Sequence, residues 1–552
     1  MKNLLKNNWH KLTLVGIVLL GVFLRLYILS LNNSFSFDEI ISSFISQQPL
    51  ENMWEYLKFE NSPPLHFILL RLWGLLFGVN DFTLRFFSVL TSALSIIAIY
   101  FLGKQLFTKN VGLLSATILS VSLFDVAIAT TARMYSLFTL LTILSFLFFW
   151  KIFILEKKQY YYILAYILVT TLALYTHITG LEILAIQGLF ILMDKKSRIY
   201  FWKFLSISII ILLLFYPWIH QFLIQKVLIS QEGLFTNSWY FNRSEIVPVI
   251  ISAPVIYIFN LLYFEFPILN TLNFFLILIV FILYLINTIH NSNKNKPRFH
   301  KQSEKLFLIA FLLPLLISTF TINTPSYRYY IPSSIAFFIL VAHSIYLGIL
   351  SLHKKYFYLL PFGIGLVIIL IFANVKIFRF SIAQPYQELA TQVDDSSIKT
   401  VLVSPVSSAI QFYTKTKKHF IPIPPSETTI IPITQLNLWQ YAIKYNWTWH
   451  NWEDPKDSLE YFENILKKIL PPDLNEFIFL ENNSFTDLAL IAVLQKNGFC
   501  TTKTTYIDYS KDKWTLYEFK KMDLNNNVNC LEYAYPQLQF FSKQLKHRLT
   551  LS

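Results

Sequence analysis

The feature that most constrains this chain is a series of apolar segments that recurs through its first 380 residues. Eleven of them are 16–22 residues long, so each can cross a bilayer core of roughly 30 Å as a helix. They lie at residues 12–30, 82–103, 111–128, 136–154, 160–176, 178–193, 203–222, 272–290, 306–322, 331–350 and 356–375. A further apolar segment, 246–264, contains Pro248 and Pro254, which favour an interfacial or re-entrant helix. The pattern predicts a polytopic α-helical membrane protein with about eleven spans.

The composition changes near residue 383. The last 169 residues return to the polar and charged content of a soluble protein. Within them, residues 400–404, 476–480 and 513–519 have the pattern of strands, and 486–496 that of an amphipathic helix ended by Gly498. We predict a multi-span domain over 1–383 and a soluble α/β domain over 384–552. The only two cysteines, Cys500 and Cys530, fall in the second domain, where either a disulfide or two free thiols would fit.

The net charge of +14 would by itself suit a nucleic-acid partner, but its distribution indicates another cause. With the N-terminus inside, the cytoplasmic segments hold nineteen Lys and Arg residues and the external loops hold six. This asymmetry is the positive-inside signal of a membrane protein. It predicts a plasma (inner) membrane location, a cytoplasmic N-terminus, an extracytoplasmic C-terminal domain, contacts with membrane lipid and no nucleic-acid partner.

Two adjacent carboxylates, Asp38 and Glu39, follow the first span directly. Ionised groups beside lipid are costly, so they need a structural or chemical reason. One carboxylate can act as a general base while the other orients it or binds a divalent cation. The alternative is that both cap the helix that follows, because acidic residues favour helix N-termini.

Arginines surrounded by aromatic residues occur at two external turns. Arg133 stands in Ala132-Arg133-Met134-Tyr135, and Arg328 precedes Tyr329-Tyr330. An arginine can bind phosphate through two parallel hydrogen bonds, although an interfacial arginine can also simply extend toward water. With the acidic pair, the two arginines indicate a site for an anionic, sugar-bearing ligand. Arg85 either joins them or marks the end of a span.

Three further residues are candidates for binding substrate. His177 lies in the turn Tyr175-Thr176-His177, while Glu60 and His66 flank the helix that begins at Pro63-Pro64. A lone histidine is more often a structural hydrogen-bonding group than a base. We therefore treat these residues as supporting groups of the site.

Taken in order, the motifs resemble those of one family. They are Asp38-Glu39; Ser62-Pro63-Pro64-Leu65 leading to Arg71-Leu72-Trp73; Phe77 to Ser88; Ala132 to Leu137; Tyr175-Thr176-His177; and Arg328-Tyr329-Tyr330-Ile331-Pro332. Each motif is weak alone, but the six together resemble the polytopic GT-C glycosyltransferases over about residues 10–380. The resemblance is to bacterial members of glycosyltransferase family 39, which are related to protein O-mannosyltransferases and lipid A aminoarabinose transferases.

The resemblance implies an inverting transfer of a hexosyl or pentosyl group from a polyprenyl-phosphate-sugar donor on the external face. By that analogy Asp38 is the base, Glu39 supports it or helps to bind a divalent cation, and Arg133, Tyr135 and Arg328 hold the lipid phosphate. The remaining substrate-binding residues would be Glu60, His66, Arg85, His177 and Tyr329. The chain departs from the family at Ser62, where histidine is common, and at Thr130-Thr131, where Gln-Glu is common.

Two other functions compete with this one. A transporter or flippase for lipid-linked sugar predicts polar or charged groups inside mid-membrane spans and paired half repeats, whereas the ionisable residues here cluster on external loops and no repeat is visible. A non-catalytic membrane scaffold predicts that Asp38→Asn leaves function intact. The sequence identifies neither the sugar nor the acceptor, which is a lipid, a protein or a glycan.

Overall fold

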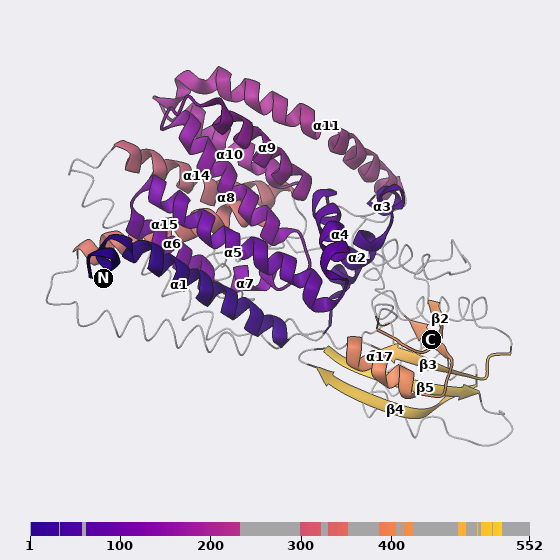
Figure 1. Cartoon of the computed structure of the whole chain (residues 1–552). Helices are drawn as coiled ribbons and strands as arrows, with labels where there is room; N and C mark the ends of the chain where they lie inside the picture. The colour runs from indigo at the N-terminus through magenta and orange to yellow at the C-terminus, as the bar shows by residue number, and fades with distance from the viewer. Residues whose placement is uncertain are drawn as a thin grey trace, which may run out of the picture. The chain divides into compact units, whose positions relative to one another are not determined.

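The computed structural model describes residues 2–31, 34–57, 62–231, 298–321, 329–351, 386–403, 410, 413–422, 473–481, 494, 498–509 and 512–521. The chain divides into two compact units (Figure 1). The helical unit comprises Met1–Asn32, Ser42–Lys226 and Trp239–Ile382. The sheet unit comprises Asn33–Ile41, Val227–Ser238 and Ala383–Ser552, so a short N-terminal segment belongs with the C-terminal part of the chain.

The described helices follow the apolar segments of the sequence. They are α1 (Lys2–Ser30), α2 (Phe37–Gln47), α3 (Leu50–Leu57), α4 (Leu65–Phe77), α5 (Asp81–Leu106), α6 (Lys109–Val121), α7 (Leu123–Ala129), α8 (Tyr135–Phe153), α9 (Tyr160–Thr176), α10 (Gly180–Met193), the 3-10 helix η1 (Ser197–Tyr200), α11 (Phe201–Gln231), α14 (Arg298–Thr321) and α15 (Ile331–Ser351). Five apolar stretches within them are long enough to cross a membrane: Trp9–Ser30, Asp81–Leu106, Tyr135–Phe153, Ser197–Leu223 and Ile331–Gly348. A helical, membrane-type fold is therefore confirmed, whereas the count of eleven spans stays a prediction.

Helix α5 occupies the centre of the helical unit and packs on α1, α4, α6, α7 and α8 (Figure 1). Its contact with α6 is close because glycines face each other across it. A Cβ added at Gly112 would lie 2.5 Å from the carbonyl oxygen of Tyr100, and one added at Gly103 would lie 3.0 Å from the Cα of Gly112. Small residues of this kind let two membrane helices approach backbone to backbone.

The segment expected as one span at 111–128 is two helices instead. Helices α6 and α7 meet at Ser122 and are bent by 61°. The Ser122 hydroxyl accepts a hydrogen bond from the backbone N–H of Asp125 at 3.2 Å, so it caps the start of α7. Helices α9 and α10, expected as spans at 160–176 and 178–193, are 17 and 14 residues long. The expected spans at 272–290 and 356–375 and the segment 246–264 lie outside the described residues.

The sheet unit contains a mixed five-stranded sheet in the order β2-β1-β3-β5-β4. Its strands are β1 (Thr400–Val403), β2 (His419–Pro422), β3 (Glu476–Glu481), β4 (Phe499–Tyr509) and β5 (Asp512–Lys521), and helix α17 (Tyr386–Asp395) precedes them. β1 runs parallel to β2 and β3, while β5 runs antiparallel to β3 and β4. The three strands expected from the sequence are present as β1, β3 and β5. Gly498 adopts a positive φ of 84° directly before β4, and the predicted helix 486–496 lies almost wholly outside the described residues.

The core of the sheet unit is formed by apolar side chains of α17 and the central strands. Leu389 and Val393 are fully buried on α17, as are Val401 on β1 and Phe477 on β3. Cys500, the second residue of β4, is disulfide-bonded. The only other cysteine of the chain, Cys530, lies outside the described residues.

Candidate active site

The acidic pair forms the first turn of α2, and its two members have different environments. The backbone N–H of Ser36 donates to Glu39 Oε2 at 2.8 Å, and Glu39 is 1% exposed. Ser36 stands just before the helix and Glu39 is its third residue, which is the spacing of a capping box. Glu39 therefore caps α2. Asp38 is half-buried, and its neighbouring position on the helix turns it about 100° away from Glu39.

Arg133 lies in the short turn 130–134 between α7 and α8 and is 7% exposed. Its Nη1 donates to the hydroxyl oxygen of Ser42, on α2, at 3.0 Å. Its carbonyl oxygen accepts a hydrogen bond from the Ser88 hydroxyl of α5 at 3.4 Å. Side chain and backbone are thus both held, so the guanidinium occupies a defined position within the helical unit.

His66 supports the same turn from α4. Its Nε2 lies 3.3 Å from the carbonyl oxygen of Ala132, and because a carbonyl can only accept, Nε2 carries the proton. Burial and the neighbouring Arg133 lower the pKa of His66 to about 3. This histidine is therefore neutral at physiological pH. Its contact with the peptide next to Arg133 makes it a supporting group of this turn.

Aromatic rings gather beside the turn, at the start of α8. The ring of His177 lies 5.8 Å from Tyr135, 5.4 Å from Phe138 and 5.5 Å from Tyr329, measured between centroids. Nδ1 of His177 accepts from the backbone N–H of Thr179 at 3.3 Å and lies 2.7 Å from the Thr179 hydroxyl. The Nδ1 position is therefore engaged within its own turn. Tyr135, His177 and Tyr329, expected as substrate-binding residues, are brought together.

The other expected site residues are distributed differently. Arg85 is fully buried in the second turn of α5. Glu60 and Arg328 lie outside the described residues. Within the described part of the chain no three His, Cys, Asp or Glu side chains gather as a metal site would require, and Glu39 is engaged as a helix cap. The described residues around Asp38 and Glu39 therefore do not form a ligand set for the expected divalent cation.

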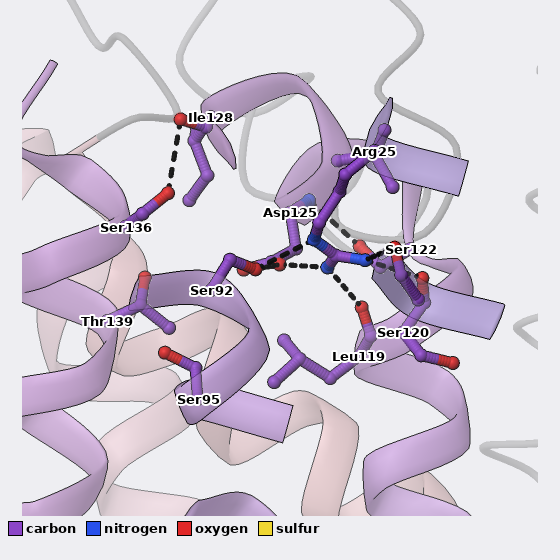
Figure 2. A network of polar contacts seen from close by, with 12 residues as sticks. Arg25, Ser92, Ser95, Leu119, Ser120, Ser122, Asp125, Ile128, Ser136 and Thr139 are labelled. Atoms are coloured by element: carbon purple, nitrogen blue, oxygen red, sulfur yellow. Dashed lines mark hydrogen bonds and ion pairs between the residues drawn. The ribbon is translucent and has the colours of Figure 1, made fainter. Parts of the chain in front are cut away.

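A second polar centre, not expected from the sequence, lies among α1, α5, α6 and α7 (Figure 2). Arg25 forms an ion pair with Asp125, and both side chains are buried. Arg25 Nε donates to the Ser92 hydroxyl at 2.8 Å, while its remaining N–H groups reach the carbonyl oxygens of Gly21, Ser120 and Leu119. Ser92 in turn donates to Asp125 Oδ2 at 2.6 Å. The signal was an arginine within the first apolar segment, which requires a partner in a membrane.

Part of the chain matches a known protein family and one curated relative. Residues 61–220 match a family model described as dolichyl-phosphate-mannose-protein mannosyltransferase. An uncharacterized protein of Aquifex aeolicus (strain VF5) is 35% identical over 108 residues, which is 19% of this chain and 21% of that protein. The match thus spans about a fifth of the length of that curated relative.

Solved structures share the fold over most of the chain. The crystal structure of ArnT from Cupriavidus metallidurans bound to undecaprenyl phosphate has a TM-score of 0.54 at 11% identity, covering 91% of this chain and 97% of that one. The Archaeoglobus fulgidus oligosaccharyltransferase in the apo form has a TM-score of 0.53 at 12% identity, covering 95% and 76%. Its complex with Zn and sulfate has a TM-score of 0.52 at 13% identity, covering 93% and 74%. The expected resemblance to GT-C glycosyltransferases is confirmed.

Proposed function

We propose that this protein is a glycosyltransferase that moves a sugar from a polyprenyl-phosphate-linked donor to an acceptor on the extracytoplasmic face of the membrane. The observation that carries the proposal is the buried Arg133, held by Ser42 and supported through Ala132 by His66, within the segment that matches the mannosyltransferase family model. A preorganised cation beside apolar helices suits the phosphate of a lipid-linked donor.

The donor class is supported by both chemistry and likeness. ArnT, which shares this fold, was solved with undecaprenyl phosphate bound. In this chain the planar guanidinium of Arg133 would bind the phosphate through two parallel hydrogen bonds, with Arg328 as a second cation. Tyr135, His177 and Tyr329 would form an aromatic wall for the sugar or the first lipid units. Arg85 would add positive charge to the same end of α5.

Asp38 would serve as the general base of an inverting transfer. The acceptor oxygen or nitrogen attacks the anomeric carbon, its proton passes to the Asp38 carboxylate, and the bond from that carbon to the phosphate oxygen breaks. The polyprenyl phosphate leaves as an anion stabilised by Arg133. Glu39 would keep Asp38 in place by capping α2. The transferred group would be a hexosyl or pentosyl unit.

The extracytoplasmic side is supported by the charge asymmetry of the loops and by Cys500. Disulfides persist in oxidising compartments and are rare in the cytosol. A disulfide-bonded Cys500 therefore supports a sheet unit outside the plasma membrane, with the N-terminus inside. Basic cytoplasmic segments would in addition attract anionic lipid headgroups.

The transporter alternative has one observation in its favour, the ion pair of Arg25 and Asp125 inside the helical unit. Ionisable groups within membrane helices often belong to a transport path. Here, however, each of the five N–H groups of Arg25 has an acceptor among α1, α5, α6 and α7 (Figure 2). A fully satisfied pair of this kind supports a structural role, so the transferase remains the proposal.

The experiment is sugar transfer in proteoliposomes supplied with a panel of labelled polyprenyl-phosphate sugars and with membrane extracts as acceptor. Wild type is compared with Asp38→Asn and with Asp81→Asn, which changes an acidic residue in the first turn of α5. The proposal expects transfer to be lost in Asp38→Asn and kept in Asp81→Asn, with both variants folded. Equal transfer in all three proteins would remove Asp38 from the reaction. Movement of donor across the bilayer without transfer would replace the proposal by a flippase.

A further inference from the structure

We infer that the sheet unit positions Asp38 and so takes part in the reaction, with Tyr413 as the positioning residue. This inference rests on the proposed role of Asp38. It gives the C-terminal part of the chain a role that neither the sequence motifs nor the matched family segment assigns. Residues 34–41 and Tyr413 both belong to the sheet unit, so the contacts between them lie within that unit.

A hydrogen bond joins two segments that lie far apart in the sequence. The backbone N–H of Phe35 donates to the phenolic oxygen of Tyr413 at 2.5 Å. Phe35 is fully buried and Ser34 is 1% exposed, so this short segment is enclosed by protein. A buried N–H that loses its acceptor leaves a polar group unsatisfied, which makes the Tyr413 oxygen important for this segment.

A series of hydrogen bonds links Phe35 to the turn that carries Asp38. The next amide, that of Ser36, donates to Glu39, and the Ser36 carbonyl accepts from the N–H groups of Glu39 and Ile40 at 3.0 Å each. Two successive amides are therefore held, one by Tyr413 and one by Glu39. Together they set the direction in which the chain enters α2. Asp38 is the second residue of that helix, so its carboxylate is carried by the same turn.

Tyr413 is itself held in place by its own turn. The N–H groups of Tyr413 and Thr414 donate to the carbonyl of the fully buried Ile410 at 2.9 and 3.1 Å. Asp394, at the end of α17, accepts from the N–H of Lys415 at 2.8 Å and from that of Thr416 at 3.1 Å, and also from the Thr416 hydroxyl. These hydrogen bonds fix the turn to α17, so the Tyr413 hydroxyl has a defined position.

The test compares Tyr413→Phe, which removes only the acceptor oxygen, with Tyr517→Phe. Tyr517 is a buried tyrosine of β5 whose ring contacts with Phe479 and Phe519 the change preserves. We expect Tyr413→Phe to lower kcat for transfer about fivefold to tenfold with the donor KM unchanged, as the loss of one hydrogen bond implies. Tyr517→Phe should keep the wild-type kcat. A wild-type kcat in Tyr413→Phe would overturn the inference.

Hydrogen exchange supplies a readout that does not depend on activity. In Tyr413→Phe the amides of residues 35–40 should exchange faster than in wild type, while those of β3 and β5 should not. Unchanged exchange at residues 35–40 would overturn the inference whatever the kinetics, and so would faster exchange with a wild-type kcat. If Tyr413→Phe does not fold, Asp394→Asn loosens the same turn from α17 and should give both effects in smaller measure.

The double variant Asp38→Asn/Tyr413→Phe separates this inference from the proposed function. If Tyr413 acts through Asp38, the residual transfer measured at high enzyme concentration is the same in the double variant as in Asp38→Asn alone. Independent, multiplying losses would show that Tyr413 acts by another route and would reject the inference. Full transfer in Asp38→Asn itself would reject the base assignment, while the exchange experiment would still report whether Tyr413 holds the start of α2.

Discussion

Arg25 and Asp125 form a buried ion pair that joins the first helix to the short helix α7 across 100 residues of sequence (Figure 2). The bend between α6 and α7 brings the Asp125 carboxylate against α1, where Ser92 of α5 shares it. Helix α7 leads directly into the turn that holds Arg133. The ion pair therefore fixes the helix from which that turn begins.

Removing one partner of this pair should be more damaging than removing both. Arg25→Met leaves a buried Asp125 carboxylate without its cation, and such changes cost about 3–5 kcal/mol in soluble proteins. Arg25→Met/Asp125→Leu removes both charges and should recover part of the loss. Thermal unfolding in detergent, monitored by aggregation or dye binding, ranks the stabilities of wild type and the two variants. A double variant less stable than Arg25→Met would contradict a direct pairing.

Arg133→Lys should reduce transfer even though the charge is kept. Lysine cannot supply the planar fork that binds phosphate through two parallel hydrogen bonds, nor can it keep the same geometry to Ser42. We expect a loss of at least tenfold in kcat/KM, mostly as a higher donor KM. Steady-state transfer at varied donor concentration measures it. The matched control is Arg198→Lys, which changes an arginine that donates hydrogen bonds to the Leu192 carbonyl. It should leave kcat/KM unchanged.

The stability of the protein should fall on acidification in a way that depends on His66. The pKa of this residue is about 3 in the folded protein, because of burial and Arg133, and near 6.5 in an unfolded chain. As pH falls from 6.5 toward 3 the unfolded chain takes up a proton that the folded protein excludes, so the free energy of unfolding decreases. His66→Gln, which keeps a donor for Ala132, should show a flatter dependence of Tm on pH between 7 and 4. If Tm depended on pH with the same slope in wild type and in His66→Gln, His66 would not be the source of the acid sensitivity.

Reduction should destabilise the sheet unit. Breaking the disulfide of Cys500 should cost about 2–4 kcal/mol, chiefly by freeing the unfolded chain. A membrane-impermeant reductant applied to intact cells, followed by thiol labelling and mass spectrometry, should make Cys500 reactive if the unit is extracytoplasmic. Labelling of Cys500 without any reductant would show a free thiol instead.

The sequence predicts best those features that rest on local patterns. The long apolar helices, β1, β3 and β5 follow from runs of apolar residues that one can recognise without knowing their neighbours. The break at Ser122 was missed because the apolar run continues through it, although a serine three residues before Asp125 is a possible helix cap. Strand β2 was missed because its four residues include a proline and are recognisable only beside β1.

In the candidate site, too, the residues set by local sequence could be predicted, whereas contacts between distant residues could not. Adjacent carboxylates at Asp38 and Glu39 were visible, and the Ser36-x-x-Glu39 spacing could already have assigned Glu39 to a cap. The partners of Arg133 and Arg25 could not be found in this way. Ser42 and Asp125 lie 91 and 100 residues away, and only helix packing brings them into reach.

The bond between Phe35 and Tyr413 has a consequence for how such proteins can be recombined. Residues on either side of it are 378 positions apart but form one structural element. A chimaera that exchanges only the C-terminal half with that of a relative would pair a foreign domain with the native segment 34–41. We expect a functional chimaera only when segment 34–41 and the C-terminal domain are both taken from the same protein. In related sequences, substitutions in the two segments should be correlated.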